Sequence, residues 1–199
     1  MPKIVDHEAQ RITFANAAIN LIAREGLEGV TMRAVAAEAG LSYGSLFHYF
    51  KSKDDLLMHV VRQSMASQTQ RVNDYANQFT GMKALERLLC DDAIINESSR
   101  DSWLVWLTFL YKAALQKPFA EMHADLISGW LDRIQGLLRQ ARDSGEIRAN
   151  LDVEFEAKAI WAFSAGVGQM GLLDPGTLPE GLQKTMISAY LDKLRSSEN

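Results

Sequence analysis

The sequence predicts an all-α protein of about nine helices. Three observations support this fold class. Apolar residues recur at spacings of three and four along most of the chain, as they do on one face of a helix. The segments with this pattern are separated by glycine and proline at positions that end or start helices. No segment alternates apolar and polar residues in the manner of a half-buried strand.

The first helix is expected from about Glu8 to Glu25, and Gly26 would end it. Its apolar face consists of four residues at helical spacing, namely Phe14, Ala18, Leu21 and Ile22. A short second helix is expected over residues 32–39. The Thr31 hydroxyl can cap its start, and Gly40 can adopt the left-handed conformation that ends a helix.

The third helix is expected over Ser42–His48, with Ser42 as its N-cap. One face should hold it to the core through Leu46, Phe47 and Phe50. The other face should be exposed, and it carries Tyr43, Gly44, Ser45, His48 and Tyr49. Two short helices joined by a tight turn form a helix-turn-helix, whose second helix can enter the major groove of DNA.

A fourth helix should start at Ser52 and run to about Ala76. Ser52 and Asp55 have the spacing of a capping box. No linker rich in Pro, Gly or Ser follows, so a three-helix helix-turn-helix head should be joined to a C-terminal helical-bundle body by one continuous helix. We expect a DNA-binding domain in residues 1–51 and a ligand-binding and dimerisation domain in residues 52–199.

Five further helices are expected in the body, at about 82–95, 101–115, 118–144, 152–170 and 179–194. The helix at 101–115 is apolar nearly all round and should be central. Pro118 suits the first position of the next helix, Gly145 its end, and Asp152 the cap of the one after. The last two helices should have apolar faces that one body cannot cover, which predicts a four-helix contact in a homodimer.

Composition and charge exclude several classes of protein. The longest apolar run, Trp103–Tyr111, is too short for a bilayer, and the N-terminal residues lack the apolar segment of a signal peptide. Cys90 is the only cysteine, so no internal disulfide is expected and a reducing cytoplasm is the expected location. Residues 1–60 carry six basic and seven acidic side chains. This balance predicts modest affinity for random DNA, with hydroxyl and backbone groups contributing to phosphate contacts.

The segment TMRAVAAEAGLSYGSLFHYFKSKDDLL, residues 31–57, resembles the DNA-binding region of the TetR family of transcriptional regulators. The preceding RITFANAAINLIAREGL, residues 11–27, matches the first helix of that region. The resemblance implies base contacts from Arg33, Tyr43, Gly44 and Ser45. It also implies contacts to the DNA backbone from Thr31, Ser42, His48, Tyr49 and Lys53.

The second half resembles the body of BetI-type members of that family, through Trp103-x-x-Trp106, Pro118 and Arg139-x-x-Arg142-x-x-Gly145-Glu146-Ile147. Some members of that group sense choline-like compounds. An effector pocket could be lined by aromatic residues of this half, namely Trp103, Trp106, Phe109, Tyr111, Trp130 and Trp161. For any single one of them, ordinary core packing is the favoured explanation.

These features together predict a ligand-responsive transcriptional repressor. A homodimer would present two recognition helices to successive major grooves of a near-palindromic operator, about 34–36 Å apart. A hydrophobic or cationic effector would shift the population toward a conformer that binds DNA poorly. One alternative is a ligand-independent DNA-binding or partner-binding regulator of the same fold.

A second alternative is a helical enzyme that retains the head. The sequence shows no nucleophile–base set, no metal-ligand spacing and no phosphate-binding glycine loop. We therefore expect no catalytic residues, no metal, no cofactor and no membrane association. His123 lies two residues from Glu121 and from Asp125, which places them on different sides of a helix. Cys90 is followed by Asp91 and Asp92, which disfavour a reactive thiolate.

Overall fold

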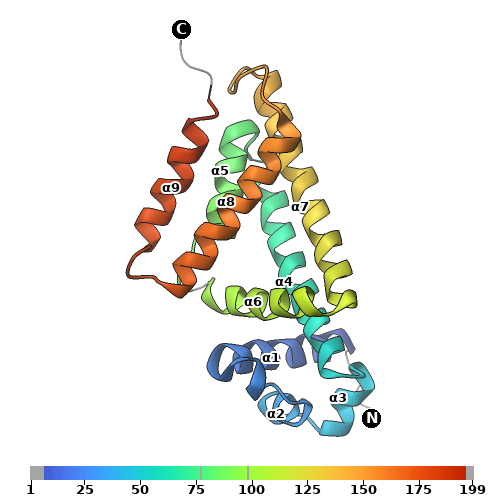
Figure 1. Cartoon of the computed structure of the whole chain (residues 1–199). Coiled ribbons are helices and arrows are strands. Elements are labelled where there is room, and N and C mark those ends of the chain that lie inside the picture. The colour runs from blue at the N-terminus through green and yellow to red at the C-terminus, as the bar shows by residue number, and fades with distance from the viewer. Residues whose placement is uncertain (1–6, 77, 98, 196–199) are drawn as a thin grey trace. The chain divides into compact units, whose positions relative to one another are not determined.

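The computed structural model describes residues 7–76, 78–97 and 99–195 (Figure 1). These residues form nine α-helices and no strand, apart from one isolated bridge between Ile147 and Arg195. The helices are α1 (His7–Gly29), α2 (Met32–Glu38), α3 (Tyr43–Tyr49), α4 (Lys53–Ala76), α5 (Gly81–Ala93), α6 (Arg100–Leu115), α7 (Lys117–Asp143), α8 (Val153–Leu173) and α9 (Glu180–Asp192). The predicted all-α fold class is confirmed.

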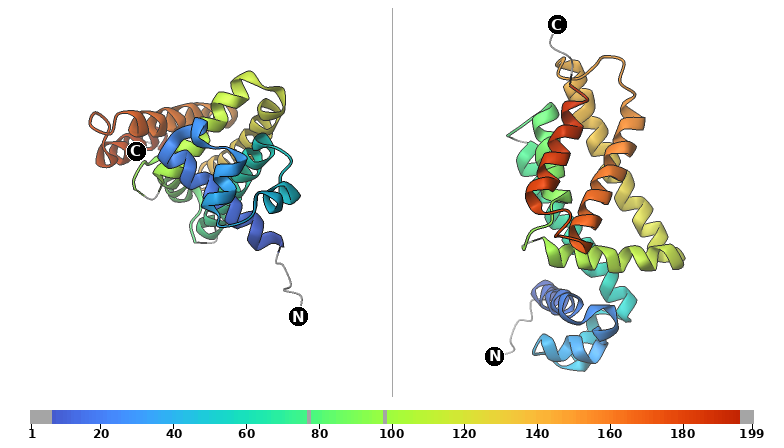
Figure 2. Two further views of the ribbon diagram at one scale, coloured as in Figure 1. Left: turned by 90° about the horizontal axis from the view of Figure 1, so that it is seen from below. Right: turned by 60° about the vertical axis from the view of Figure 1, so that its left-hand side comes forward.

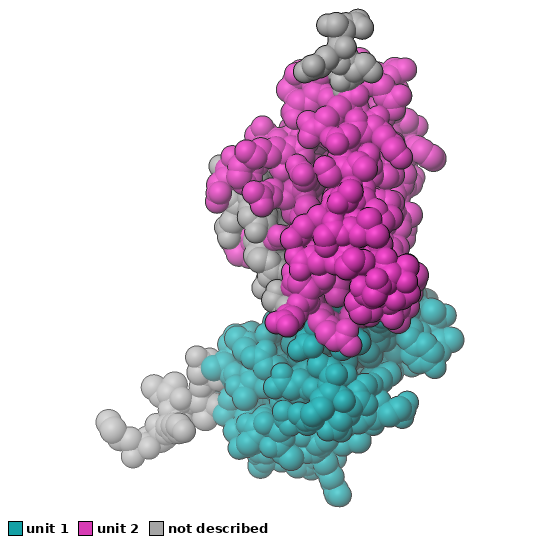
Figure 3. Space-filling model, turned by 90° about the vertical axis from the view of Figure 1, so that its left-hand side faces the viewer, with its two compact units in different colours: residues 1–66, 101–120 teal, residues 67–100, 121–199 magenta. Residues whose placement is uncertain are grey.

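The chain divides into two compact units, drawn in different colours in Figure 3. Unit 1 comprises residues 1–66 and 101–120, and therefore includes α1, α2, α3, the start of α4 and α6. Unit 2 comprises residues 67–100 and 121–199, with α5, most of α7, α8 and α9. These are units of packing, so the functional boundary between residues 51 and 52 stays a prediction.

The helix ends of unit 1 follow the local signals in the sequence. Gly26 has φ 70° and ψ −174°, so it interrupts α1 where a break was predicted, and one further turn runs to Gly29. Thr31 Oγ1 accepts a hydrogen bond from the backbone N–H of Ala34 at 3.1 Å. Gly40 has φ 66°, which is the left-handed conformation expected after α2.

The core of unit 1 corrects one prediction about α3. Leu46 and Phe50 are buried, but Phe47 remains 43% exposed and does not hold the helix to the core. The reason is geometric, because α3 has only seven residues and can bury a single stripe. Phe47 lies one turn from Tyr43 on the outer face, where the two ring centroids are 4.8 Å apart.

The helix α6 differs from its predicted central position. Only Val105 and Phe109 are buried in it, and Tyr111 and Leu115 are more than 60% exposed. Most of its other large apolar residues, including Trp103, Trp106 and Leu110, are half-buried. The prediction that α6 would be buried, made because its residues are apolar nearly all round, is therefore wrong.

In unit 2, α5 packs against both α8 and α9, as the views in Figures 1 and 2 agree. The core there includes Leu85, Leu89, Ile160 and Ile187. The predicted cap of α8 is present, because Asp152 Oδ1 accepts from the N–H groups of residues 154 and 155, each at 3.1 Å. Within the described part of the chain, no helix combines the length and apolar character needed to cross a bilayer.

Candidate nucleic-acid interface

Side-chain hydroxyls cap the starts of both α2 and α3. Ser42 Oγ accepts from the N–H of Ser45 at 3.1 Å, as Thr31 Oγ1 does from Ala34. Each hydroxyl accepts in these bonds and so retains its own proton for a second partner. Both residues are exposed, so a DNA phosphate oxygen is a suitable acceptor for that proton.

Arg33 and Tyr43 form the most distinctive feature of the exposed face. The Arg33 guanidinium lies 5.6 Å from the centroid of the Tyr43 ring, and the Tyr43 side chain is 44% exposed. No ion pair to Arg33 is found within the described residues. Glu38, at the end of α2, is bound by Arg24 at 3.0 Å. That hydrogen bond holds the pKa of the Glu38 carboxyl below its usual value.

Gly44 and Ser45 complete the predicted base-reading set. Gly44 is exposed, and a Cβ placed on it would meet nothing within 4 Å. The backbone of α3 can therefore approach another surface closely at this position. Ser45 is half-buried, and its N–H is already bound to Ser42, so its hydroxyl is the group available for readout.

His48 and Tyr49 lie at the end of α3. Their rings are 5.4 Å apart in an edge-on arrangement, and His48 is exposed. The Tyr49 ring packs 5.9 Å from Phe14, which belongs to the core of unit 1. The Tyr49 hydroxyl lies 2.9 Å from Nδ1 of His7. Sequence reasoning assigned no role to His7, because nothing near it in the chain points to α3.

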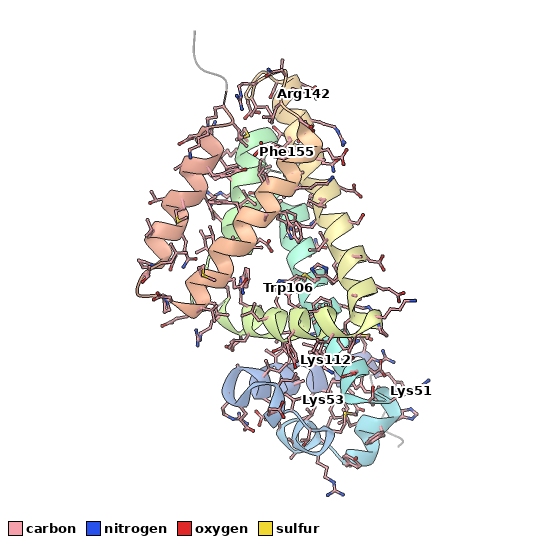
Figure 4. The ribbon with its side chains drawn as sticks, in the orientation of Figure 1. Lys51, Lys53, Trp106, Lys112, Arg142 and Phe155 are labelled. Carbon is pink, nitrogen blue, oxygen red and sulfur yellow. The ribbon has the colours of Figure 1, made fainter. Side chains whose placement is uncertain are left out.

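The Lys53 side chain is half-buried. Its Nζ donates to the carbonyl of Leu27 at 2.6 Å. Burial, with a contribution from the charge of Lys112, lowers the pKa of Lys53. The phosphate contact stays a prediction, because an ammonium has three donors and the Leu27 bond uses one. Lys51, which is also labelled in Figure 4, is exposed, and sequence reasoning assigned it no role.

A second lysine of unit 1, Lys112, forms an ion pair with Asp54. Lys112 Nζ on α6 lies 2.5 Å from Asp54 Oδ1 in the first turn of α4, and 5.2 Å from the centroid of the Phe119 ring. The Lys112 side chain is nearly buried. This pair fixes α6 to the start of α4 within unit 1, and no sequence signal joins residues so far apart.

The six predicted pocket residues divide between the units. Unit 1 contains Trp103, Trp106, Phe109 and Tyr111, and unit 2 contains Trp130 and Trp161. Phe109 is fully buried and lies 5.2 Å from Trp106. Tyr111 is 63% exposed, so it does not form a closed wall within the chain.

The two tryptophans of unit 2 are half-buried. The Nε1 atom of Trp130 is buried, and no acceptor for it is found within the described residues. The Trp161 ring lies 6.4 Å from the ring of His123, and burial lowers the pKa of His123. Among residues 7–76, 78–97 and 99–195, no cluster of three His, Cys, Asp or Glu has the arrangement of a metal site.

A capped helix-turn-helix with an exposed arginine–tyrosine pair defines the class of protein, which is a DNA-binding regulator. Residues 15–60 match the model of bacterial regulatory proteins of the tetR family, and residues 83–196 match that of the C-terminal region of BetI-type transcriptional repressors. The chain belongs to the TetR family of transcriptional regulators.

Individual relatives agree with this assignment. The HTH-type transcriptional regulator PksA of Bacillus subtilis is 29% identical over 98% of this chain and 94% of its own length. BetI of Vibrio vulnificus is 24% identical over 97% of this chain and 96% of its own length. These relatives are regulators and not enzymes, which confirms the expectation that the chain is not an enzyme.

A solved structure extends the likeness to the whole fold. A transcriptional regulator of Saccharomonospora viridis, crystallised in complex with choline, superposes with a TM-score of 0.88. The match covers 96% of this chain and 100% of that one, at 21% identity. At this identity the likeness establishes the shared helical fold.

Proposed function

We propose that the chain is a ligand-responsive repressor that binds a near-palindromic operator as a homodimer and leaves it when a small molecule binds. The effector is hydrophobic or cationic. In this proposal residues 1–51 read the DNA and residues 52–199 bind the effector and dimerise. The exposed pair of Arg33 and Tyr43 carries the proposal, because a guanidinium that lies over an aromatic ring and has no acidic partner among the described residues suits a base edge.

The base-reading role of Arg33 has a matched control in Arg24. Arg33→Ala should reduce the ratio of specific to random DNA affinity about tenfold, since a bidentate arginine–guanine pair is worth about 1–3 kcal/mol of discrimination. Arg24→Ala removes an exposed arginine of the same unit that is paired with Glu38. It should leave the ratio unchanged. An unchanged ratio in Arg33→Ala would assign the readout to Tyr43 and Ser45.

The salt dependence of binding distinguishes the two candidate phosphate lysines. Each phosphate contact by a cation should contribute about one to the magnitude of the salt slope per half-site. Lys53→Ala should lower the slope if Lys53 donates to a phosphate while bound to Leu27. Lys51→Ala should lower it if the exposed lysine makes the contact instead.

The exposed apolar side chains of α8 and α9 support the homodimer. Phe155 and Leu173 are 67% and 62% exposed. They lie on the same side of α8, about five turns apart. Between them the same side carries the small exposed residues Ala162 and Gly166, which permit close approach of a second copy. Phe155→Asp should give monomers in sedimentation, whereas Lys158→Asp, one turn away and exposed, should not.

The aromatic side chains of residues 52–199 support a cationic or apolar effector. Rings bind quaternary ammonium ions through cation–π contacts of about 0.5–2 kcal/mol each. The choline complex of the Saccharomonospora viridis protein makes choline the first compound to test. The buried Trp130 N–H could donate to an oxygen atom such as the choline hydroxyl.

The test combines operator selection with ligand titration. Sites selected from a random DNA pool should be near-palindromic, and the effector should weaken their binding while it quenches tryptophan fluorescence. Single Trp→Phe variants at 103, 106, 130 and 161 should identify the tryptophans that report. Tight DNA binding that no cationic or apolar ligand changes would favour the ligand-independent alternative. Failure to select any site would overturn the proposal.

A further inference from the structure

The start of α1 meets the end of α3 at a cluster of two histidines and one tyrosine. His7 Nδ1 lies 2.9 Å from the hydroxyl of Tyr49. The His7 ring centroid lies 5.7 Å from that of Tyr49 and 6.1 Å from that of His48. Because the Tyr49 ring packs against the buried Phe14, its hydroxyl has a fixed position from which to meet His7.

The hydrogen bond between His7 and Tyr49 has two forms, and they differ in what Tyr49 can offer a third partner. When Nδ1 of His7 lacks a proton, it accepts the hydroxyl proton of Tyr49, and only oxygen lone pairs remain exposed. When Nδ1 carries a proton, it donates to the Tyr49 oxygen, and the hydroxyl proton becomes available. A DNA phosphate oxygen can only accept, so only the second form allows Tyr49 to donate to DNA.

Building on the proposed function, and on the contact to the DNA backbone that the TetR resemblance implies for Tyr49, we propose that His7 is a positioning residue for operator binding. It holds the Tyr49 hydroxyl with its proton directed to a phosphate, and operator affinity rises as His7 takes up a proton. Protonation fixes the donating form of the imidazole, so that the Tyr49 hydroxyl proton stays available. Histidine is the side chain suited to this role, because it titrates between about pH 5 and 8.

The surrounding charges determine the controls. Among the described residues, the His48 ring on α3 lies beside His7, and the charges of Glu8 and Arg11 on α1 and of Asp55 and Arg62 on α4 act on His59 of α4. Burial, followed by the charge of Arg11, lowers the pKa of His59, so its protonation requires more acid than that of an ordinary histidine. His48 is the closer competitor, since it is exposed and was itself predicted to contact the backbone.

The experiment measures operator affinity between about pH 5.5 and 8 for the full-length protein and four variants. His7→Leu removes the donor, His7→Asn keeps an amide donor that does not titrate, Tyr49→Phe removes the hydroxyl, and His48→Gln removes the competing histidine. Wild type should bind about two- to tenfold more tightly per half-site at the lower pH, the range expected for one hydrogen bond. His48→Gln should retain the part of this change that depends on His7, and His7→Leu should lose it.

A double-mutant cycle separates action through Tyr49 from a simple charge effect. If His7 acts through the hydroxyl, His7→Leu should have no further effect on affinity in the Tyr49→Phe background. His7→Asn should restore tight binding at pH 8 in the presence of Tyr49. Equal pH profiles of wild type and His7→Leu would overturn the inference. An undiminished His7→Leu effect in the Tyr49→Phe background would do the same.

Failure of the inference and failure of the proposed function give different results. A wild-type protein that binds no selected DNA would overturn both. If the protein binds selected operators but the pH dependence of its affinity is the same in wild type and His7→Leu, the inference alone is overturned. The contact can also be tested without DNA, because Tyr49→Phe should shift the Nδ1 resonance of His7 in imidazole nitrogen NMR. The absence of a shift would remove the structural basis of the inference, even if DNA binding is normal.

Discussion

The backbone N–H groups at the starts of α3 and α5 find their hydrogen-bond acceptors in different ways. In α3 the N–H of Ser45 bonds to Ser42, three residues earlier. In α5 the N–H of Met82 bonds to Glu146 Oε2 at 3.2 Å, 64 residues away in the chain. Unit 1 therefore caps this helix from its own sequence, whereas unit 2 caps α5 from a residue that follows α7.

The same contrast continues in the core of unit 2. Gln183 on α9 is buried, accepts from the N–H of Ile95 at 2.7 Å and donates to the carbonyl of Leu178 at 2.8 Å. Tyr190 donates to the buried carboxylate of Glu156 at 2.6 Å. Burial, followed by this hydrogen bond, raises the pKa of Tyr190. Distant polar bonds make the helices of unit 2 dependent on one another, whereas local caps act one helix at a time.

The largest effect is expected from Gln183→Leu. The change leaves the buried N–H of Ile95 and the partly buried carbonyl of Leu178 without this partner, at about 1–3 kcal/mol each, so unfolding free energy should fall by about 4 kcal/mol. Gln169→Leu makes the same replacement at an exposed position of α8 and should change stability little. Denaturant unfolding measures both. Equal stabilities of the two variants would show that unit 2 does not depend on this distant bond.

Gly81→Ala should have the next largest effect. Gly81 has φ 56°, and an added Cβ would overlap Glu146 Oε1. Strain and displacement of the cap should together cost about 2–3 kcal/mol. Gly136→Ala, within α7 and with open space around it, should instead be neutral or slightly stabilising. Adding Glu146→Ala to Gly81→Ala should not lower stability by the full sum, because the two changes remove the same contact.

A smaller loss is expected from Ser42→Ala. Removal of a hydroxyl cap typically costs about 1 kcal/mol, and Ser42→Gly should cost only a few tenths. Because this cap is local, its effect should add to that of Gln183→Leu within about 0.5 kcal/mol. Thermal or denaturant unfolding of the double variant measures this, and strong non-additivity would contradict the proposed contrast between local and distant caps.

The smallest effect concerns Asp174, in the turn after α8. Its carboxylate accepts from the hydroxyl and then the backbone N–H of Thr177, which holds the pKa of Asp174 below its usual value. A lowered folded-state pKa means that the stabilisation is present above about pH 4 and is lost as pH falls through the lower folded value. Asp174→Asn should therefore lose slightly more stability at pH 7 than at pH 2. A pH series of melting temperatures measures this difference.

The contrast between local and distant bonds also explains which predictions from sequence succeeded. The caps by Thr31, Ser42 and Asp152 could be predicted, because donor and acceptor lie within three residues of each other. The exposure of Phe47 could not be predicted, since it depends on which stripe of α3 meets the core. The same limit applies to the bond between Lys53 and Leu27, whose partners are 26 residues apart.

The candidate DNA-binding residues show the same division. The position of Tyr43 beside Arg33 follows from the short turn between two helices that local signals define. The partner of Tyr49 depends on where α1 begins relative to α3, and this is a property of the folded unit. The pocket residues were inferred from residue type alone, and Tyr111 shows that an aromatic side chain in an apolar helix can still be exposed.

The open position at Gly44 has a consequence for how such a regulator can diversify. It lies on the exposed face of α3, and an added Cβ would meet nothing within 4 Å. Replacing glycine within a helix also favours the helical backbone, by roughly 0.5–1 kcal/mol for alanine. A gene duplicate could therefore acquire a new side chain at this position, and with it a new operator preference, without first acquiring a compensating change elsewhere in the fold.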